Sequence, residues 1–292
     1  MILDLGGDTS LDVLDFFMMA DQRFVVTAAE PASFLDTYNF VKVSFYRFLD
    51  RLFAEHMDKH HIAGAAISVV KDGELFFAKG YGSANLEAGT PVDPERTAFN
   101  LASVSKLFAW TAVMQLVEQR VLDLDADVNT YLDFEIPATY EQPITLAHLL
   151  THTSGFEYSA IDDLVRDVDD LVPARDWLVS HIPARVRPPG QVAGYSNYNT
   201  NLAGYMVARV SGMPYDQYVR QEILDPLGMA HTVIESIAPP ELEPYRSVGY
   251  TYGDGAFQAF PKYWAQPAIL PAAGLAPSAT DMARFMIAYL QD

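Results

Sequence analysis

A tight β-hairpin followed by a long, mostly helical stretch is the feature that most constrains the fold of this chain. Residues 65–82, AAISVVKDGELFFAKGYG, form two apolar runs separated by Lys71-Asp72-Gly73. An Asp-Gly pair between two such runs is a strong hairpin signal. Helical patterns then follow over 103–119, 144–156, 173–182, 199–212, 215–229 and 280–292. Strands followed by helices predict an α+β fold, an antiparallel sheet beside a mostly helical domain.

The first 48 residues follow another pattern. Residues 1–5 and 23–29 are predicted strands, whereas 11–20 and 30–49 are predicted helices. This order predicts a short α/β fragment at the N-terminus. Residues 3–43 resemble part of a partition ATPase of the MinD/ParA type, in which the aspartate at the position of Asp4 lies near the nucleotide magnesium. No G-x-x-x-x-G-K-[ST] phosphate loop occurs in the chain, and an ATPase of that type needs one.

We therefore predict two parts, with a boundary between residues 48 and 49. Residues 1–48 would be a non-functional ATPase fragment, and residues 49–292 a separate domain. The alternative is that residues 1–48 are an ordinary N-terminal extension. From residue 50 a new helical pattern begins, which we expect to close at Gly64.

Charge and composition exclude several kinds of partner. The chain carries 19 Lys and Arg against 38 Asp and Glu, a net charge of −19. Such a surface repels nucleic-acid backbones and anionic lipid. No apolar run approaches the roughly 18 residues of a membrane-spanning helix, and acidic residues near the N-terminus do not fit a signal peptide. We expect no nucleic-acid partner and no membrane span, and the sequence leaves the oligomeric state open.

Metal and cofactor chemistry find little support in the sequence. There is no cysteine, which excludes disulfides, thiolate zinc sites and a cysteine nucleophile. His56, His60 and His61 have a spacing that a zinc site could use, but no H-E-x-x-H pattern surrounds them. They fit a solvated helix face better. We expect no metal and no cofactor.

Two short motifs carry the candidate chemistry. In LASVSKLF, Lys106 follows Ser103 by three residues, so both side chains share one face at the start of a helix. In GYSNYN, Tyr195 and Asn197 form a Y-x-N pattern. Each motif alone is weak, because a capped surface helix or a tyrosine-containing loop explains it equally well.

Together these motifs carry a stronger resemblance. The stretches at 64–82, 101–108, 149–156, 195–199 and 225–229, in this order, resemble the serine hydrolases of the β-lactamase/penicillin-binding-protein superfamily, most closely the branch related to class C β-lactamases. The resemblance covers about 50–292 and implies a β-lactamase/transpeptidase-like fold. It implies that Ser103 is the nucleophile, Lys106 its base, Tyr195 a proton carrier and Asn197 a substrate-binding residue.

Other candidate nucleophiles and bases fit less well. Ser105 points about 200° around the helix from Ser103. His152 could pair with a serine, but the resemblance makes its loop structural, and we interpret it as a turn former. No G-x-S-x-G occurs, which argues against an α/β-hydrolase.

The resemblance also implies a third motif, K-T-G or H-x-G, on a strand downstream of residues 271–286. No such motif follows in this sequence. We therefore expect the C-terminal strands of the sheet to be missing and the activity of this polypeptide to be in doubt.

The predicted function is that of a serine hydrolase acting through an acyl-enzyme on ester, amide or β-lactam carbonyls, as a β-lactamase, esterase or D-amino-acid peptidase. The alternative is a catalytically incompetent fragment or a penicillin-recognising relative without enzymatic activity. Relatives of this kind are usually exported, to the periplasm or cell surface.

Overall fold

The computed structural model describes residues 31–291, and the chain divides into two compact units, 1–64 and 65–292. The elements predicted within residues 1–29 lie outside the described residues. In the first unit a single helix, α2 (Pro31–His60), replaces the two helices expected over 30–49 and 50–64. It is continuous because no glycine or proline interrupts residues 32–60. The predicted boundary at 48/49 falls inside α2 and stays a prediction.

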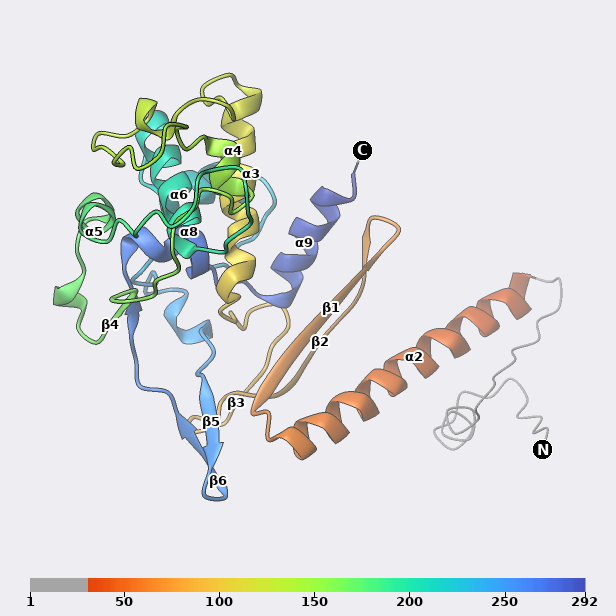
Figure 1. Ribbon diagram of the computed structural model, residues 1–292. Helices are drawn as coiled ribbons and strands as arrows, with labels where there is room; N and C mark the ends of the chain where they lie inside the picture. Colours follow the sequence, from red (N-terminus) through yellow and green to blue (C-terminus); the bar gives the residue numbers. More distant parts are fainter. Residues whose placement is uncertain (1–30, 292) are drawn as a thin grey trace. The chain divides into compact units, whose positions relative to one another are not determined.

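The second unit contains the predicted hairpin. Strands β1 (Gly64–Lys71), β2 (Glu74–Asn85) and β3 (Thr90–Pro91) form a sheet in that order. Asp72 and Gly73 have φ values of 53° and 76°, as a two-residue hairpin turn requires. Strand β3 pairs antiparallel with β2, and Ser83 lies opposite Pro91. Helix α9 (Ala279–Tyr289) packs against β2, and its Phe285 stacks on Phe108 of the helical part, so α9 lies between the sheet and the helical part (Figure 1).

The helical part follows the predicted order closely. Its α-helices are α3 (Lys106–Glu118), α4 (Leu146–Leu150), α5 (Ala174–Ser180), α6 (Asn197–Ser211), α7 (Tyr215–Val219) and α8 (Leu270–Ala273). The 3₁₀ helices are η1 (Ala102–Ser105), η2 (Val128–Thr130), η3 (Val168–Asp170), η5 (Glu243–Tyr245) and η6 (Pro267–Ile269), and η4 (Arg220–Leu224) is a π-helix. Two short strand pairs, β4 (Leu164–Val165) with β7 (Trp264–Ala265) and β5 (Tyr250–Gly253) with β6 (Ala256–Ala259), complete this unit.

Helix α6 is the centre of the helical part. Helices α3, α4 and α8 all pack against it, as Figure 1 shows. Nine of its residues are buried, among them Leu202 and Met206, which are fully enclosed. The helix ends at Gly212 with a left-handed φ of 73°, the predicted glycine stop. Burial on every side of its first two turns makes α6 a rigid support for the residues at its start.

Within residues 31–291, no helix is both long enough and apolar enough to cross a lipid bilayer.

Candidate active site

Ser103 lies in the first turn of η1, on a backbone that turns sharply just before it. Ala102 has a φ of 45°, a left-handed conformation that a side-chain-bearing residue adopts only under constraint. The Oδ1 atom of Asn100 accepts the Ala102 N–H at 2.8 Å, and the Leu101 N–H donates to the Leu275 carbonyl at 3.0 Å. These bonds hold the turn, which leaves the Ser103 side chain exposed at the start of the helix.

Lys106 is buried directly behind this serine, with 5% of its surface exposed. Its Nζ atom lies 3.1 Å from Ser103 Oγ, 2.9 Å from Asn197 Oδ1 and 3.0 Å from the carbonyl oxygen of Ala272. A buried charged group is tolerated when hydrogen bonds compensate it, and these three acceptors match the three protons of an ammonium. The fixed partners hold Nζ within reach of the serine hydroxyl.

Tyr195 and Asn197 enter the same site from the start of α6. Ser196, between them, has an extended backbone (φ −149°, ψ 129°), so its neighbours point away from its own side chain. Ser196 Oγ donates to the carbonyl of Glu157 at 3.3 Å, whereas the Tyr195 hydroxyl lies 2.7 Å from Ser103 Oγ. This alternation explains the Y-x-N spacing. The structure thus brings Ser103, Lys106, Tyr195 and Asn197 into one hydrogen-bonded group.

Ser105 and His152 are not members of this hydrogen-bonded group. Ser105 is 1% exposed, and its Oγ accepts the Leu275 N–H at 3.0 Å. It therefore faces the interior, away from the Ser103 hydroxyl. His152 forms a turn, with a φ of 55°, and its ring also lies against Tyr195, with 4.6 Å between ring centroids. That ring contact was not predicted from the sequence.

The segment 271–286 contributes a group that sequence patterns did not reveal. Its side chains suggested no catalytic role, yet the Ala272 carbonyl of α8 accepts a hydrogen bond from Lys106. Every residue has a backbone carbonyl, so the sequence cannot identify this acceptor. Only the packing of α8 against η1 reveals that the Ala272 carbonyl reaches Lys106. Gly204 of α6 allows α8 to pack closely against α6, because a Cβ there would lie 2.2 Å from Pro271 Cγ.

Asp163 is a second residue that sequence reasoning missed. Burial raises the pKa of its carboxyl to about 6, against the opposing effects of His181 and Lys106. The carbonyl of Asp163 accepts the N–H of Gln266 at 3.0 Å, which ties the loop before β4 to the segment leading into α8. Only the folded chain brings this carboxyl into the electrostatic field of Lys106.

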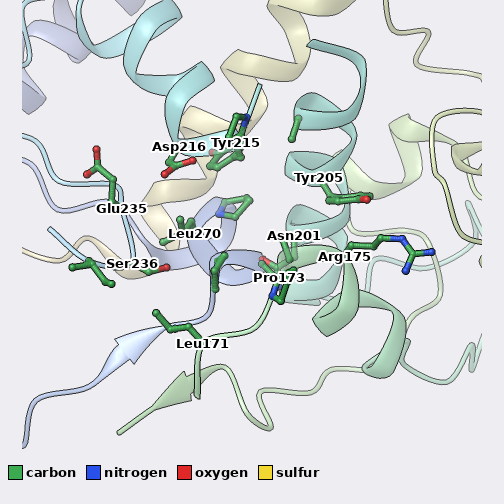
Figure 2. A pocket seen from close by; sticks show the side chains of 17 residues that line it. Leu171, Pro173, Arg175, Asn201, Tyr205, Tyr215, Asp216, Glu235, Ser236 and Leu270 are labelled. Carbon is green, nitrogen blue, oxygen red and sulfur yellow. The ribbon is translucent and has the colours of Figure 1, made fainter. Parts of the chain in front are cut away.

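A cavity of about 710 Å³ lies elsewhere in this unit. Figure 2 shows Asn201 and Tyr205 of α6 and Leu270 of α8 among its lining side chains. None of the four candidate residues lines it. It therefore lies outside the hydrogen-bonded group around Ser103.

The hairpin sheet, the helices around α6 and the Ser-Lys-Tyr group together define the β-lactamase/penicillin-binding-protein class of folds. The family profile described as "Beta-lactamase" matches residues 49–292. The chain therefore belongs to the β-lactamase family.

Two curated relatives are similar to part of this chain. The putative penicillin-binding protein PbpX of Bacillus subtilis is 35% identical over 189 residues, which are 62% of this chain and 44% of PbpX. Protein flp of Staphylococcus aureus (strain N315) is 29% identical over 192 residues, which are 63% of this chain and 37% of flp. The matched regions thus make up less than half of the length of each relative.

Solved structures agree on the fold. The octameric penicillin-binding protein homologue from Pyrococcus abyssi superposes with a TM-score of 0.72 at 28% identity, over 84% of this chain and 56% of that one. FmtA from Staphylococcus aureus superposes with a TM-score of 0.67 at 23% identity, over 84% of this chain and 64% of that one. The predicted β-lactamase/transpeptidase-like α+β fold is confirmed.

Proposed function

We propose that this chain is a serine hydrolase that forms an acyl-enzyme on Ser103 with ester, amide or β-lactam substrates. The observation that carries the proposal is the position of Ser103 Oγ, which lies 2.7 Å from the Tyr195 hydroxyl and 3.1 Å from Lys106 Nζ. A serine hydroxyl is a weak nucleophile until an adjacent base removes its proton. Both neighbours lie within the distance that proton transfer requires.

Lys106 acts as the base for Ser103 in its neutral form, once its ammonium has given up one of its three protons to solvent. A neutral amine has two N–H groups, which the oxygens of Asn197 and Ala272 accept. Its lone pair then faces Ser103 Oγ and takes the hydroxyl proton as the Oγ–carbon bond forms. The side-chain amide of Asn197 keeps its own N–H groups for a substrate carbonyl.

Tyr195 supplies the proton for the leaving group. As the bond between the carbonyl carbon and the leaving group breaks, the Tyr195 hydroxyl protonates the departing atom, and the Lys106 ammonium returns a proton to the tyrosine. The Nζ atom lies 4.9 Å from the Tyr195 ring centroid. The backbone N–H of Ser103, in the first turn of a helix, is one donor to the oxyanion. Water then releases the acyl group and restores Ser103.

The choice among ester, amide and β-lactam substrates depends on the residues around the reacting atoms. The relationship to PbpX and to the Pyrococcus abyssi homologue, both described as penicillin-binding proteins or homologues of one, supports β-lactams and peptide-like amides as the first compounds to test. The class C-related branch and an exported location remain parts of this proposal.

Steady-state hydrolysis tests the proposal. Turnover of p-nitrophenyl acetate and of a chromogenic β-lactam should fall about 10⁴- to 10⁶-fold in Ser103→Ala. Ser105→Ala is the matched control, since it removes a hydroxyl two residues away that faces the interior. Turnover that survives in Ser103→Ala contradicts the proposal. A stable penicillin adduct on Ser103 without turnover of either substrate supports the rival, a penicillin-recognising protein without hydrolytic activity.

A further inference from the structure

His152 links the end of α4 to the segment that carries Tyr195. Its left-handed φ of 55° turns the chain after α4. Its N–H donates to the Leu149 carbonyl at 3.2 Å, and its carbonyl accepts the N–H of Gly194 at 2.7 Å. Gly194 directly precedes Tyr195, so the backbone of His152 fixes the chain one residue before the tyrosine.

The imidazole of His152 accepts two hydrogen bonds at one nitrogen. Nδ1 lies 3.1 Å from Asn199 Nδ2 and 3.4 Å from the backbone N of Ser196. The Ser154 hydroxyl donates to Asn199 Oδ1 at 2.6 Å and accepts the Phe156 N–H at 3.3 Å. This orients the Asn199 amide so that its NH₂ group faces the histidine. Two N–H donors at Nδ1 require a lone pair there, so the ring proton is on Nε2.

The face of the same ring supports Tyr195. The His152 and Tyr195 ring centroids are 4.6 Å apart, and Trp110 of α3 meets the histidine ring edge-on at 6.0 Å. The hydroxyl of this tyrosine contacts Ser103 Oγ at 2.7 Å. A shift of the histidine ring would therefore move the phenol relative to the serine.

The surroundings of His152 disfavour a positive charge on its ring. Burial and the nearby Lys106 ammonium lower the pKa of His152 below its usual value. The titratable groups that face the ring are Lys106 from α3 and Tyr195 from the segment before α6, whereas Trp110 and Asn199 do not titrate. A proton on Nδ1 would face two N–H donors and add a second cation beside Lys106.

We propose that His152 is a positioning residue whose neutral, Nε2-protonated ring holds the Tyr195 hydroxyl against Ser103. The role rests on the proposed function, because Tyr195 is the proton carrier there. His152 itself touches no reacting atom.

Two substitutions separate this role from a structural one. Asparagine at 152 tolerates a positive φ and places Oδ1 where the histidine has Nδ1, so His152→Asn keeps the acceptor. His152→Phe keeps a ring and removes the acceptor. His148→Phe is the matched control, because His148 Nδ1 also accepts a backbone N–H, that of Thr145 at 3.1 Å. Its substitution removes a backbone hydrogen bond to a histidine without removing the contact to Tyr195.

The first measurement is the rate at which a fluorophosphonate labels Ser103, from pH 4 to pH 9. His152→Phe should lower the rate about 10- to 100-fold, the cost of a small misplacement of a catalytic group. His152→Asn restores the acceptor but not the ring, so it should recover only the part of the loss that comes from the missing acceptor, and it should remove the fall in rate that protonation of His152 causes in the wild type at acidic pH. His148→Phe should keep the wild-type rate and profile. Equal rates in folded His152→Phe and wild type overturn the proposal.

The second measurement needs no activity. Nitrogen-15 NMR of the His152 ring, assigned by its absence in His152→Asn, reports the tautomer directly. A protonated Nε2 and an unprotonated Nδ1 at pH 7 support the positioning role. A proton on Nδ1 at pH 7 overturns it. Wild-type protein that reacts with no fluorophosphonate refutes the hydrolase proposal and leaves this second measurement to decide the geometry of His152.

Discussion

The geometry of the candidate site depends most on Lys106. Its side chain is almost completely buried, and all three of its acceptors come from different elements: η1, α6 and α8. A residue that is hydrogen-bonded to three elements holds them in fixed relative positions. Catalytic groups need this precise positioning. Removal of the amine therefore affects both the chemistry and the local packing.

Lys106→Met should abolish most of the activity while the protein stays folded. Methionine preserves much of the apolar stem and removes the base, a loss of about 100- to 10,000-fold in labelling rate. Thermal unfolding checks the fold. Lys262→Met is the control, because that ammonium lies 2.7 Å from Glu243 and its side chain is 60% exposed. A Lys106→Met protein that labels at the wild-type rate contradicts the role of this amine as the base.

Asp163 should make stability depend on pH. Its carboxyl has a pKa of about 6 in the folded chain, raised by burial from an ordinary value of 3.8. The folded state then holds a proton that the unfolded state loses first, so stability is highest below pH 3.8 for this group and falls as pH rises through about 6. Asp163→Asn should gain stability relative to wild type at pH 8 and gain less at pH 4. Denaturant unfolding of both proteins at the two pH values measures the difference in their free energy of unfolding. An equal difference at pH 4 and pH 8 contradicts the raised pKa of Asp163.

At the scale of elements, short sequence patterns correctly predicted the turns and helix ends whose conformation depends on neighbouring residues. The Asp72-Gly73 hairpin, the helical pattern over 103–119 and the stop of α6 at Gly212 each depend on a few neighbouring residues. The structure confirms all three, with 103–119 divided into η1 and then α3 from Lys106. The support of Lys106 by α8 could not be predicted, because it depends on how a four-residue helix packs against η1. Short helices have little propensity of their own and take their position from tertiary packing.

The turn after α4 should tolerate no side chain at Gly155. A Cβ there would lie 2.0 Å from the Arg187 carbonyl oxygen, on a residue with a φ of 85°. Gly155→Ala should destabilise the protein by more than 2 kcal/mol, roughly the cost of overpacking plus strain. Gly73→Ala is the matched control, with a φ of 76° and open space around the new Cβ, and should cost about 1 kcal/mol from strain alone. Denaturant unfolding compares the two, and equal costs contradict the close approach.

At the scale of the whole molecule, the family relationship covers the region that contains the site. The β-lactamase profile begins at residue 49, and the four candidate residues lie within the unit 65–292. Sequence motifs identified Ser103, Lys106, Tyr195 and Asn197 because their side chains define the pattern. They did not identify His152 or Asp163 as neighbours of the site, because those contacts join segments that are distant in sequence.

Removal of residues 1–48 should leave the fold of the remainder intact. The β-lactamase profile begins at residue 49, so we propose that the first part adds nothing to the core of the second. The thermal transition of residues 49–292 should be unchanged or sharper than that of the full chain, as measured by circular dichroism. A large loss of stability after the deletion would show that the two parts fold together.

The assignment of Ser103 as the nucleophile is tested most directly by intact-mass and peptide-mapping mass spectrometry after reaction with a fluorophosphonate and with a penicillin. We expect a single adduct on the peptide that contains Ser103, in wild type and in Ser105→Ala, and none in Ser103→Ala. A label that persists in Ser103→Ala, or maps to another residue in the wild type, would contradict the assignment of Ser103 as the nucleophile.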